Sequence, residues 1–221
     1  FIVVHPRMPF GYSVGYLFLQ NYTHRRKLQL VFCIFPLNIL KTNHSEPVGI
    51  LEINHESLQL IIHSHIFLYG NCISEEVRFN IEEEINTLWN EPRALVWYNK
   101  EPYLLLVDVK VFLFKNLKPE DILSNTNPRN NYIRIEATAK GNISYVDGVC
   151  SNTGYFLLEN LYKGSTTAAH EYGHLLGLEH PHDLDIRGKG RPGIMYPRGT
   201  LVDAIYQYDP AAKAGEKGEI G

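Results

Sequence analysis

The spacing of apolar residues predicts a series of strands and helices along most of the chain. Residues 58–69 form an apolar run that is typical of a β-strand, and Gly70–Asn71 marks a turn after it. Over 77–90, apolar residues recur every three or four positions, which predicts an amphipathic helix. Ser74 is suited to cap that helix, and Pro92 should stop it.

The second half of the chain continues this pattern. Two apolar runs, 93–98 and 103–114, flank a short polar stretch and predict a hairpin. Residues 132–139 alternate between apolar and polar side chains, which predicts a half-exposed strand. A second helix is expected over 167–176, after a run of Gly, Ser and Thr. This order of elements predicts an α+β domain with a sheet, two main helices and a small irregular part after Gly177.

Composition is that of a globular protein and narrows the range of partners. Of 221 residues, 44% are apolar and 20% are charged, which suits one domain with a substantial core. The net charge is −3, and no basic stripe with interleaved aromatic residues is present. We therefore expect no nucleic acid partner and a monomeric protein.

The N-terminal region does not join the pattern clearly. Arg25–Lys27 followed by the apolar run 28–40 has the shape of a signal peptide, with a buried strand as the alternative. The run is too short for a transmembrane segment. We divide the chain into an uncertain segment 1–54, a main domain 55–210 and a flexible or truncated tail 211–221, and expect the chain to be a fragment of a secreted or extracellular protein.

Three cysteines are too few for a disulfide framework. Cys33, Cys72 and Cys150 are widely separated. A single pair, Cys72 with Cys150, and three free thiols are both compatible with the sequence.

The segment 170–180 carries the strongest chemical signal in the chain. It reads His-Glu-Tyr-Gly-His-Leu-Leu-Gly-Leu-Glu-His, so a helix would place His170 and His174 on one face, one turn apart. Gly177 can adopt a positive φ, end the helix and let His180 approach from another direction. Three histidine ligands would leave the fourth position of a tetrahedral zinc ion free, which is typical of a catalytic site. Glu171 lies beside the first ligand and is expected to act as general base and acid.

Neighbouring residues offer alternatives for some of these roles. His182 could replace His180 as third ligand, although the turn at Gly177 favours His180. Asp183 or Asp185 could accept a hydrogen bond from a ligand histidine, or could be surface carboxylates. Met195 could form a hydrophobic floor below the metal, or be a weak ligand.

The whole segment resembles the metzincin clan of zinc metallopeptidases. The HExxHxxGxxH run at 170–180 and the later Met195-Tyr196-Pro197, which is similar to the Met-turn of that clan, carry the resemblance. Ala168–Ala169 and Leu178–His180 are most like the matrixin branch. The resemblance implies a twisted mixed sheet, a backing helix, an active-site helix and a small irregular C-terminal subdomain.

The resemblance also implies a function. We expect a zinc-dependent endopeptidase that uses one catalytic Zn²⁺ and acts on a protein or peptide substrate. Alternatives are a zinc-stabilised binding module without catalysis, and a toxin or processing peptidase within a larger polypeptide. No segment resembles a calcium loop, and no cysteine-switch propeptide is found, although Cys150 could act as a thiolate that blocks the zinc or be an ordinary core residue.

Substrate contacts are expected from two places. The strand 132–139 is the candidate free edge for an extended peptide, with Ile133 and Ile135 as contact residues. After the Met-turn, Tyr196, Pro197 and residues 198–204 are expected to form the wall of a specificity pocket.

Overall fold

A computed structural model describes residues 2–5, 16–17 and 48–207 of the chain. The signal-like segment 25–40, Cys33 and the tail 211–221 lie outside the described residues, so the predictions made for them stay predictions.

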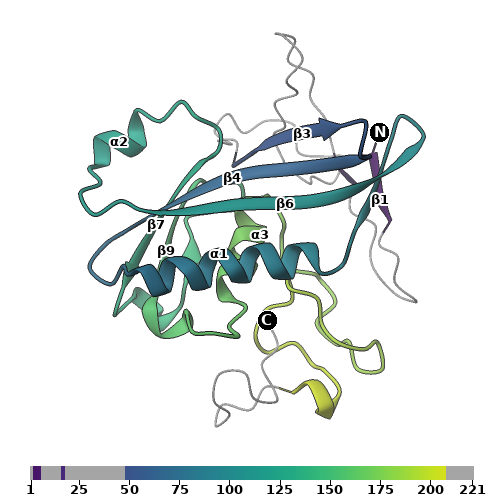
Figure 1. The fold of residues 1–221 in the computed structure, drawn as a ribbon. Coiled ribbons are helices and arrows are strands. Elements are labelled where there is room, and N and C mark those ends of the chain that lie inside the picture. The colour runs from purple at the N-terminus through teal and green to yellow at the C-terminus, as the bar shows by residue number, and fades with distance from the viewer. Residues whose placement is uncertain (1, 6–15, 18–47, 208–221) are drawn as a thin grey trace.

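The fold is α+β, with one curled mixed sheet and a few helices (Figure 1). The described strands are β1 (Ile2–His5), β2 (Tyr16–Leu17), β3 (Ile50–Asn54), β4 (Gln59–Tyr69), β5 (Leu95–Tyr98), β6 (Glu101–Leu113), β7 (Asn130–Glu136), β8 (Tyr145–Val146) and β9 (Thr153–Leu157). The α-helices are α1 (Glu75–Asn90), α2 (Pro119–Leu123) and α3 (Thr167–Leu175), and short 3-10 turns are η1 (Lys140–Asn142), η2 (Leu158–Asn160) and η3 (Ala204–Tyr206). The mixed sheet and the two main helices confirm the coarse prediction.

Strand β4 is the centre of the sheet. It runs parallel to β6 along one side, and its other side is shared by antiparallel β3 and parallel β7. The strand order is β2-β1-β5-β6-β4-β7-β9-β8, with β3 beside β4. Because β3 pairs with β4, the sheet begins before residue 55, where the sequence pattern suggested a boundary.

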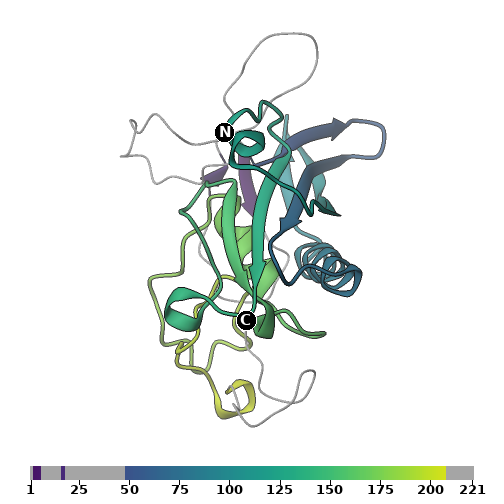
Figure 2. The ribbon, with the colours of Figure 1, turned by 90° about the vertical axis from the view of Figure 1, so that its left-hand side faces the viewer.

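Helix α1 packs against one face of the sheet, as Figure 2 shows from the end of the helix. Its N-terminus is capped by Ser74, whose Oγ accepts a hydrogen bond from the Val77 N–H at 3.2 Å, as the sequence predicted. The buried residues Val77, Ile81 and Ile85 form the apolar stripe that faces the core. Burial of this stripe holds the helix in place far more than its intrinsic propensity does.

The polar side of α1 closes one edge of strand β6. Asn86 and Asn90 each accept a hydrogen bond from a backbone N–H of β6 and donate one to the carbonyl of the same residue, Val109 and Val107 respectively, all at 2.9 Å. Glu82 accepts from the Val111 N–H at 2.7 Å. These side chains replace a neighbouring strand, so this stretch of β6 is not open to another chain.

Strand β7 is an interior strand, so the prediction that it forms the free edge is wrong. It pairs with β4 on one side and with β9 on the other, and β8 lies at that end of the sheet instead. Ile133 and Ile135 have no exposed surface and belong to the core, so their side chains cannot contact a substrate. Alternation along 132–139 identified a strand but could not reveal its neighbours, because pairing partners are distant in sequence.

The chain after α3 forms the irregular lower part of the domain. Gly177 adopts a φ of 95° directly after the helix, as predicted. Beyond it, the described residues contain an isolated bridge between Asp185 and Leu201 and the short turn η3. In Figure 1 this segment lies below α1, apart from the sheet.

Two further predictions can be compared with the described residues. Cys72 and Cys150 are not joined by a disulfide, so the pairing considered for them does not form. Within the described part of the chain, every helix is too short or too polar to cross a membrane.

Candidate metal centre

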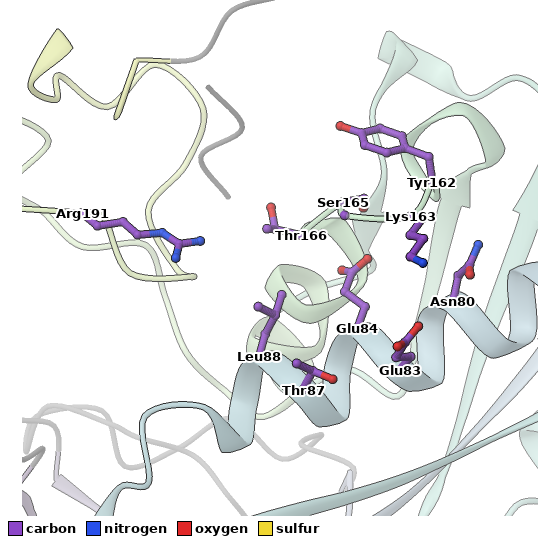
Figure 3. Close-up of a pocket in the computed structure, with 11 residues that line it drawn as sticks. Asn80, Glu83, Glu84, Thr87, Leu88, Tyr162, Lys163, Ser165, Thr166 and Arg191 are labelled. Carbon is purple, nitrogen blue, oxygen red and sulfur yellow. The ribbon is translucent and has the colours of Figure 1, made fainter. Parts of the chain in front are cut away.

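Helix α3 is fixed in position by contacts with α1 and β4. The Glu84 carboxylate accepts a hydrogen bond from the Ala169 N–H at 2.9 Å, and the Trp89 indole N–H donates to the Ala169 carbonyl at 2.9 Å. Tyr172 is fully buried, with its hydroxyl 2.9 Å from Ser64 Oγ of β4. Figure 3 shows Glu84 extending from α1 towards the start of α3. These contacts leave the helix little freedom to shift.

Three imidazoles converge beside this helix. The Nε2 atoms of His170, His174 and His180 lie 3.0, 3.1 and 3.2 Å from one another. Ligands of a tetrahedral zinc ion, each about 2.0–2.1 Å from the metal, would be about 3.4 Å apart. The observed triangle is only slightly tighter, so these residues could hold a metal ion.

Backbone carbonyls fix which ring nitrogens face the centre of this triangle. His170 Nδ1 lies 2.7 Å from the Ile194 carbonyl, and His174 Nδ1 lies 2.7 Å from the Leu178 carbonyl. A carbonyl can only accept, so each Nδ1 must carry the proton and each Nε2 of a neutral ring carries a lone pair. Two lone pairs 3.2 Å apart repel each other, and a cation between them turns that repulsion into binding.

The surroundings of His170 and His180 favour the neutral form of the ring, which is the form that ligates metals. Burial, together with the neighbouring His174, His180 and Arg198, lowers the pKa of His170 to about 4, against the raising effect of the Ile194 carbonyl. Burial, followed by the proximity of His174, also lowers the pKa of His180. Neutral imidazole is the ligand form, so these rings are ready to bind a cation near neutral pH.

Glu171 is a buried carboxylate next to the first of the three histidines. It is only 8% exposed, and its burial raises its pKa to about 7, with a backbone hydrogen bond from Val146 acting in the opposite direction. It is not one of the converging groups. A carboxylate with a pKa near 7 can both accept and release a proton at neutral pH, which suits a general base and acid.

His180, and not His182, completes the cluster. The turn after α3 is closed by hydrogen bonds from the Gly177 N–H to the His174 carbonyl at 3.0 Å and from the Leu178 N–H to the Gly173 carbonyl at 2.9 Å. His182 is exposed and does not belong to the cluster.

Asp183 and Asp185 are paired elsewhere. Lys189 Nζ bonds Asp183 at 2.5 Å, and the Arg187 guanidinium bonds Asp185 at 2.6 Å. The acceptors of the two histidine Nδ1 protons are therefore carbonyls, and the alternative in which these carboxylates hold the ligand histidines is wrong.

Met195 packs against helix α3 at Gly173. The Tyr196 N–H donates to the Gly193 carbonyl at 3.1 Å and closes a four-residue turn around Met195. A Cβ atom added at Gly173 would overlap Met195 Sδ and would lie 3.0 Å from the Trp89 ring. The glycine inside the motif is thus what allows the methionine to approach. This packing favours the floor role over ligation.

The remaining site predictions are placed as follows. Tyr196 and Pro197 are half-buried next to the turn of Met195, and their substrate role stays a prediction. Cys150 is buried, and its backbone N–H donates to the His174 carbonyl at 3.0 Å, but its thiol is not among the converging ligand groups. It packs behind the cluster as a core residue.

Several contributors to the site were missed by the sequence analysis. The carbonyls of Ile194 and Leu178 and the backbone of Val146 act through main-chain atoms, which carry no residue-type signal. The contact of Gly173 with Met195 could have been suspected, since a glycine inside a helix is costly unless something packs closely against it.

Comparison with known proteins adds no further assignment: no protein-family model matches the chain, and no curated protein matches it significantly.

Proposed function

We propose that the chain is a zinc-dependent endopeptidase of the metzincin type, most similar to the matrixin branch. The observation that carries this proposal is the convergence of three Nε2 atoms beside a buried carboxylate that remains outside the ligand set. Carbonyl acceptors set the tautomers of two of the three rings, His170 and His174. A zinc-stabilised module without catalysis has no need for that carboxylate, which costs folding free energy to bury.

Zinc fits this donor set better than calcium or magnesium does. Three imidazole nitrogens at near-tetrahedral spacing suit zinc, whereas calcium and magnesium prefer oxygen ligands. When bound, zinc would supply the Lewis acidity that activates water and polarises a peptide carbonyl.

The chain's own residues would divide the remaining work. Glu171 would take the proton of the attacking water and later deliver it to the leaving amine. His170 and His174 would keep their orientation through the Ile194 and Leu178 carbonyls while the charge at the site changes.

The substrate would lie beside β8. This strand is at the end of the sheet, and Val146 within it is hydrogen-bonded to Glu171 through its backbone. An extended peptide added to β8 would therefore pass close to the proposed base. This replaces the role first given to 132–139.

The sharpest test of the proposal is Glu171→Gln, which keeps the shape of the side chain but removes the proton acceptor. We expect cleavage of a quenched fluorescent peptide to fall by about 10²–10⁴-fold. Zinc content, measured by mass spectrometry of the dialysed protein, should stay at one ion per chain.

The matched control is Glu179→Gln, the same chemical change at an exposed position of the same segment. It should leave both zinc content and cleavage unchanged. Undiminished cleavage by Glu171→Gln would contradict the proposed role. A wild-type chain that binds zinc but cleaves no member of a peptide library would instead support the binding module.

A further inference from the structure

A cavity of about 540 Å³ lies at the carboxyl ends of the neighbouring strands β6, β4 and β7. Its lining comes from the turn after β4, from the connection between β6 and β7, and from the end of β7; the residues are Tyr69, Gly70, Asn71, Lys115, Leu117, Lys118, Pro119, Ile122, Arg134 and Glu136. Figure 1 shows the α2 segment at this end of the sheet. None of the three clustered histidines lines it. Crevices at the carboxyl ends of parallel strands are common ligand sites.

The charge of this cavity is strongly one-sided. Its lining holds three cations, Lys115, Lys118 and Arg134, against a single carboxylate, Glu136. Lys115 and Lys118 are exposed and form no side-chain ion pair with any described residue. Their charges therefore remain available to a ligand.

The single carboxylate serves to hold Arg134 in position. Glu136 Oε1 accepts from Arg134 Nε at 2.9 Å and lies 2.8 Å from Arg134 Nη2, and Asn71 Nδ2 donates to the same carboxylate at 3.0 Å. The guanidinium carbon also lies 5.8 Å from the centre of the Tyr155 ring. This fixed guanidinium leaves Nη1 without a partner among the described residues. A planar guanidinium held in this way is well suited to oxyanions.

Tyr69 adds a neutral donor to the same wall. Burial raises the pKa of its hydroxyl, against the lowering effect of Arg134, so the hydroxyl keeps its proton and can donate it.

Another cavity among the described residues lacks this bias. It has a volume of about 600 Å³ and lies between α1 and the start of α3 (Figure 3). Glu83 and Glu84 line it together with Lys163 and Arg191, so its charges balance. This cavity therefore has no net charge that would favour an anion over a cation.

We propose that the cavity around Arg134 binds a small oxyanion, namely the phosphate or sulfate group of a monoester or the free ion. Lys115 and Lys118 supply positive charge from one side, and Arg134 and Tyr69 supply directed donors from the other. Leu117 and Ile122 provide an apolar surface for the organic part of an ester. This site is separate from the histidine cluster and does not depend on the proposed peptidase activity.

The test uses the full 221-residue chain and isothermal titration calorimetry with sodium sulfate, against sodium chloride at equal ionic strength. We expect saturable binding of one sulfate. The variant Lys115→Gln/Lys118→Gln should weaken binding at least tenfold. The matched control Lys100→Gln/Lys163→Gln removes the same charge from the β5–β6 turn and from the charge-balanced cavity, and should change affinity less than twofold.

Two further titrations identify the form of the ligand and test whether this site is independent of the histidine cluster. Titration with phenyl phosphate and phenyl sulfate distinguishes an ester, which should bind more tightly through its apolar contacts with Leu117 and Ile122, from the ion alone; either result supports the oxyanion site. His174→Ala should bind sulfate as the wild type does, whatever happens to metal binding. The proposal is overturned if sulfate shows no saturable binding beyond the chloride control, or if both double variants lose affinity equally.

Discussion

Two histidine-containing regions of this chain use the imidazole ring in opposite ways. On the sheet, His63 lies between two carboxylates, with Nδ1 2.8 Å from Asp108 and Nε2 3.1 Å from Glu52. Beside α3, His170 and His174 use only Nδ1, towards carbonyls, and both Nε2 atoms face a shared point.

This difference separates a structural network from a candidate metal centre. The two ring nitrogens of His63 face carboxylates on opposite sides of the ring, so neither is directed at a shared point with another histidine, and the ring links β3, β4 and β6. In the cluster, the carbonyls of Ile194 and Leu178 bond Nδ1 of His170 and His174 and leave Nε2 of both rings directed at the shared point. The number of histidines therefore says less about metal binding than the direction in which their unused lone pairs point.

Removing one ring from each region should give the largest contrast. His174→Ala removes one of the three proposed ligands, and we expect zinc affinity to fall by at least about 10³-fold, more than the 10–100-fold typical of losing a hydrogen-bond partner of a ligand. His63→Ala should change zinc affinity less than twofold. Competition with a fluorescent chelator measures the zinc affinity of both variants. Equal losses of affinity would contradict the claim that only the cluster beside α3 binds zinc.

The floor below the cluster can be tested with a single methyl group. Gly173→Ala places a Cβ where Met195 Sδ lies, so we expect a loss of about 1–3 kcal/mol in the free energy of unfolding and weaker zinc binding. Gly148→Ala adds the same methyl where no atom lies within 4 Å and should change zinc binding little. Urea unfolding of both variants gives the comparison, and a fully tolerated Gly173→Ala would remove Met195 from its proposed place.

The His63 network should show the smallest effect, and a dependence on pH. Burial raises the pKa of Asp108, but hydrogen bonds from Lys110 and His63 outweigh it and hold that pKa below its usual range. A lowered folded-state pKa stabilises the fold above about pH 4, and this stabilisation is lost as the pH falls through the lowered value. Because the group is partly exposed, Asp108→Asn should cost less than about 1 kcal/mol at pH 7 and almost nothing at pH 2. Urea titrations at the two pH values check this; a cost that grows on acidification would refute it.

Sequence patterns were sufficient for most of the local structure. The cap at Ser74, the end of α1 near Pro92 and the positive φ of Gly177 all depend on residues close in the chain, and each was predicted correctly. The hairpin of β5 and β6 was also predicted, and its turn residues Asn99 and Lys100 both adopt positive φ. Such features depend on residues that are close together in the chain, so they can be predicted from a single sequence.

Features that depend on distant pairing were not predictable in the same way. Strand β7 alternates like an edge strand but is enclosed by β4 and β9, and β3 was not recognised as part of the sheet. At the site, the candidate side-chain ligands were identified by residue type and spacing. The carbonyls of Ile194 and Leu178 could not be identified from the sequence, because every residue has a main-chain carbonyl. The sequence does show two polar residues four positions apart on one face of α1, Asn86 and Asn90. Their role in covering the edge of β6 can be recognised only when the position of β6 is known.

Anomalous diffraction above and below the zinc absorption edge, from crystals of the full chain grown with zinc, tests the central claim most directly. The account predicts one strong anomalous peak about 2.0–2.1 Å from Nε2 of His170, His174 and His180, with the Glu171 carboxylate outside the ligand set. Absence of density at that point, or a peak beside His63 instead, would contradict it.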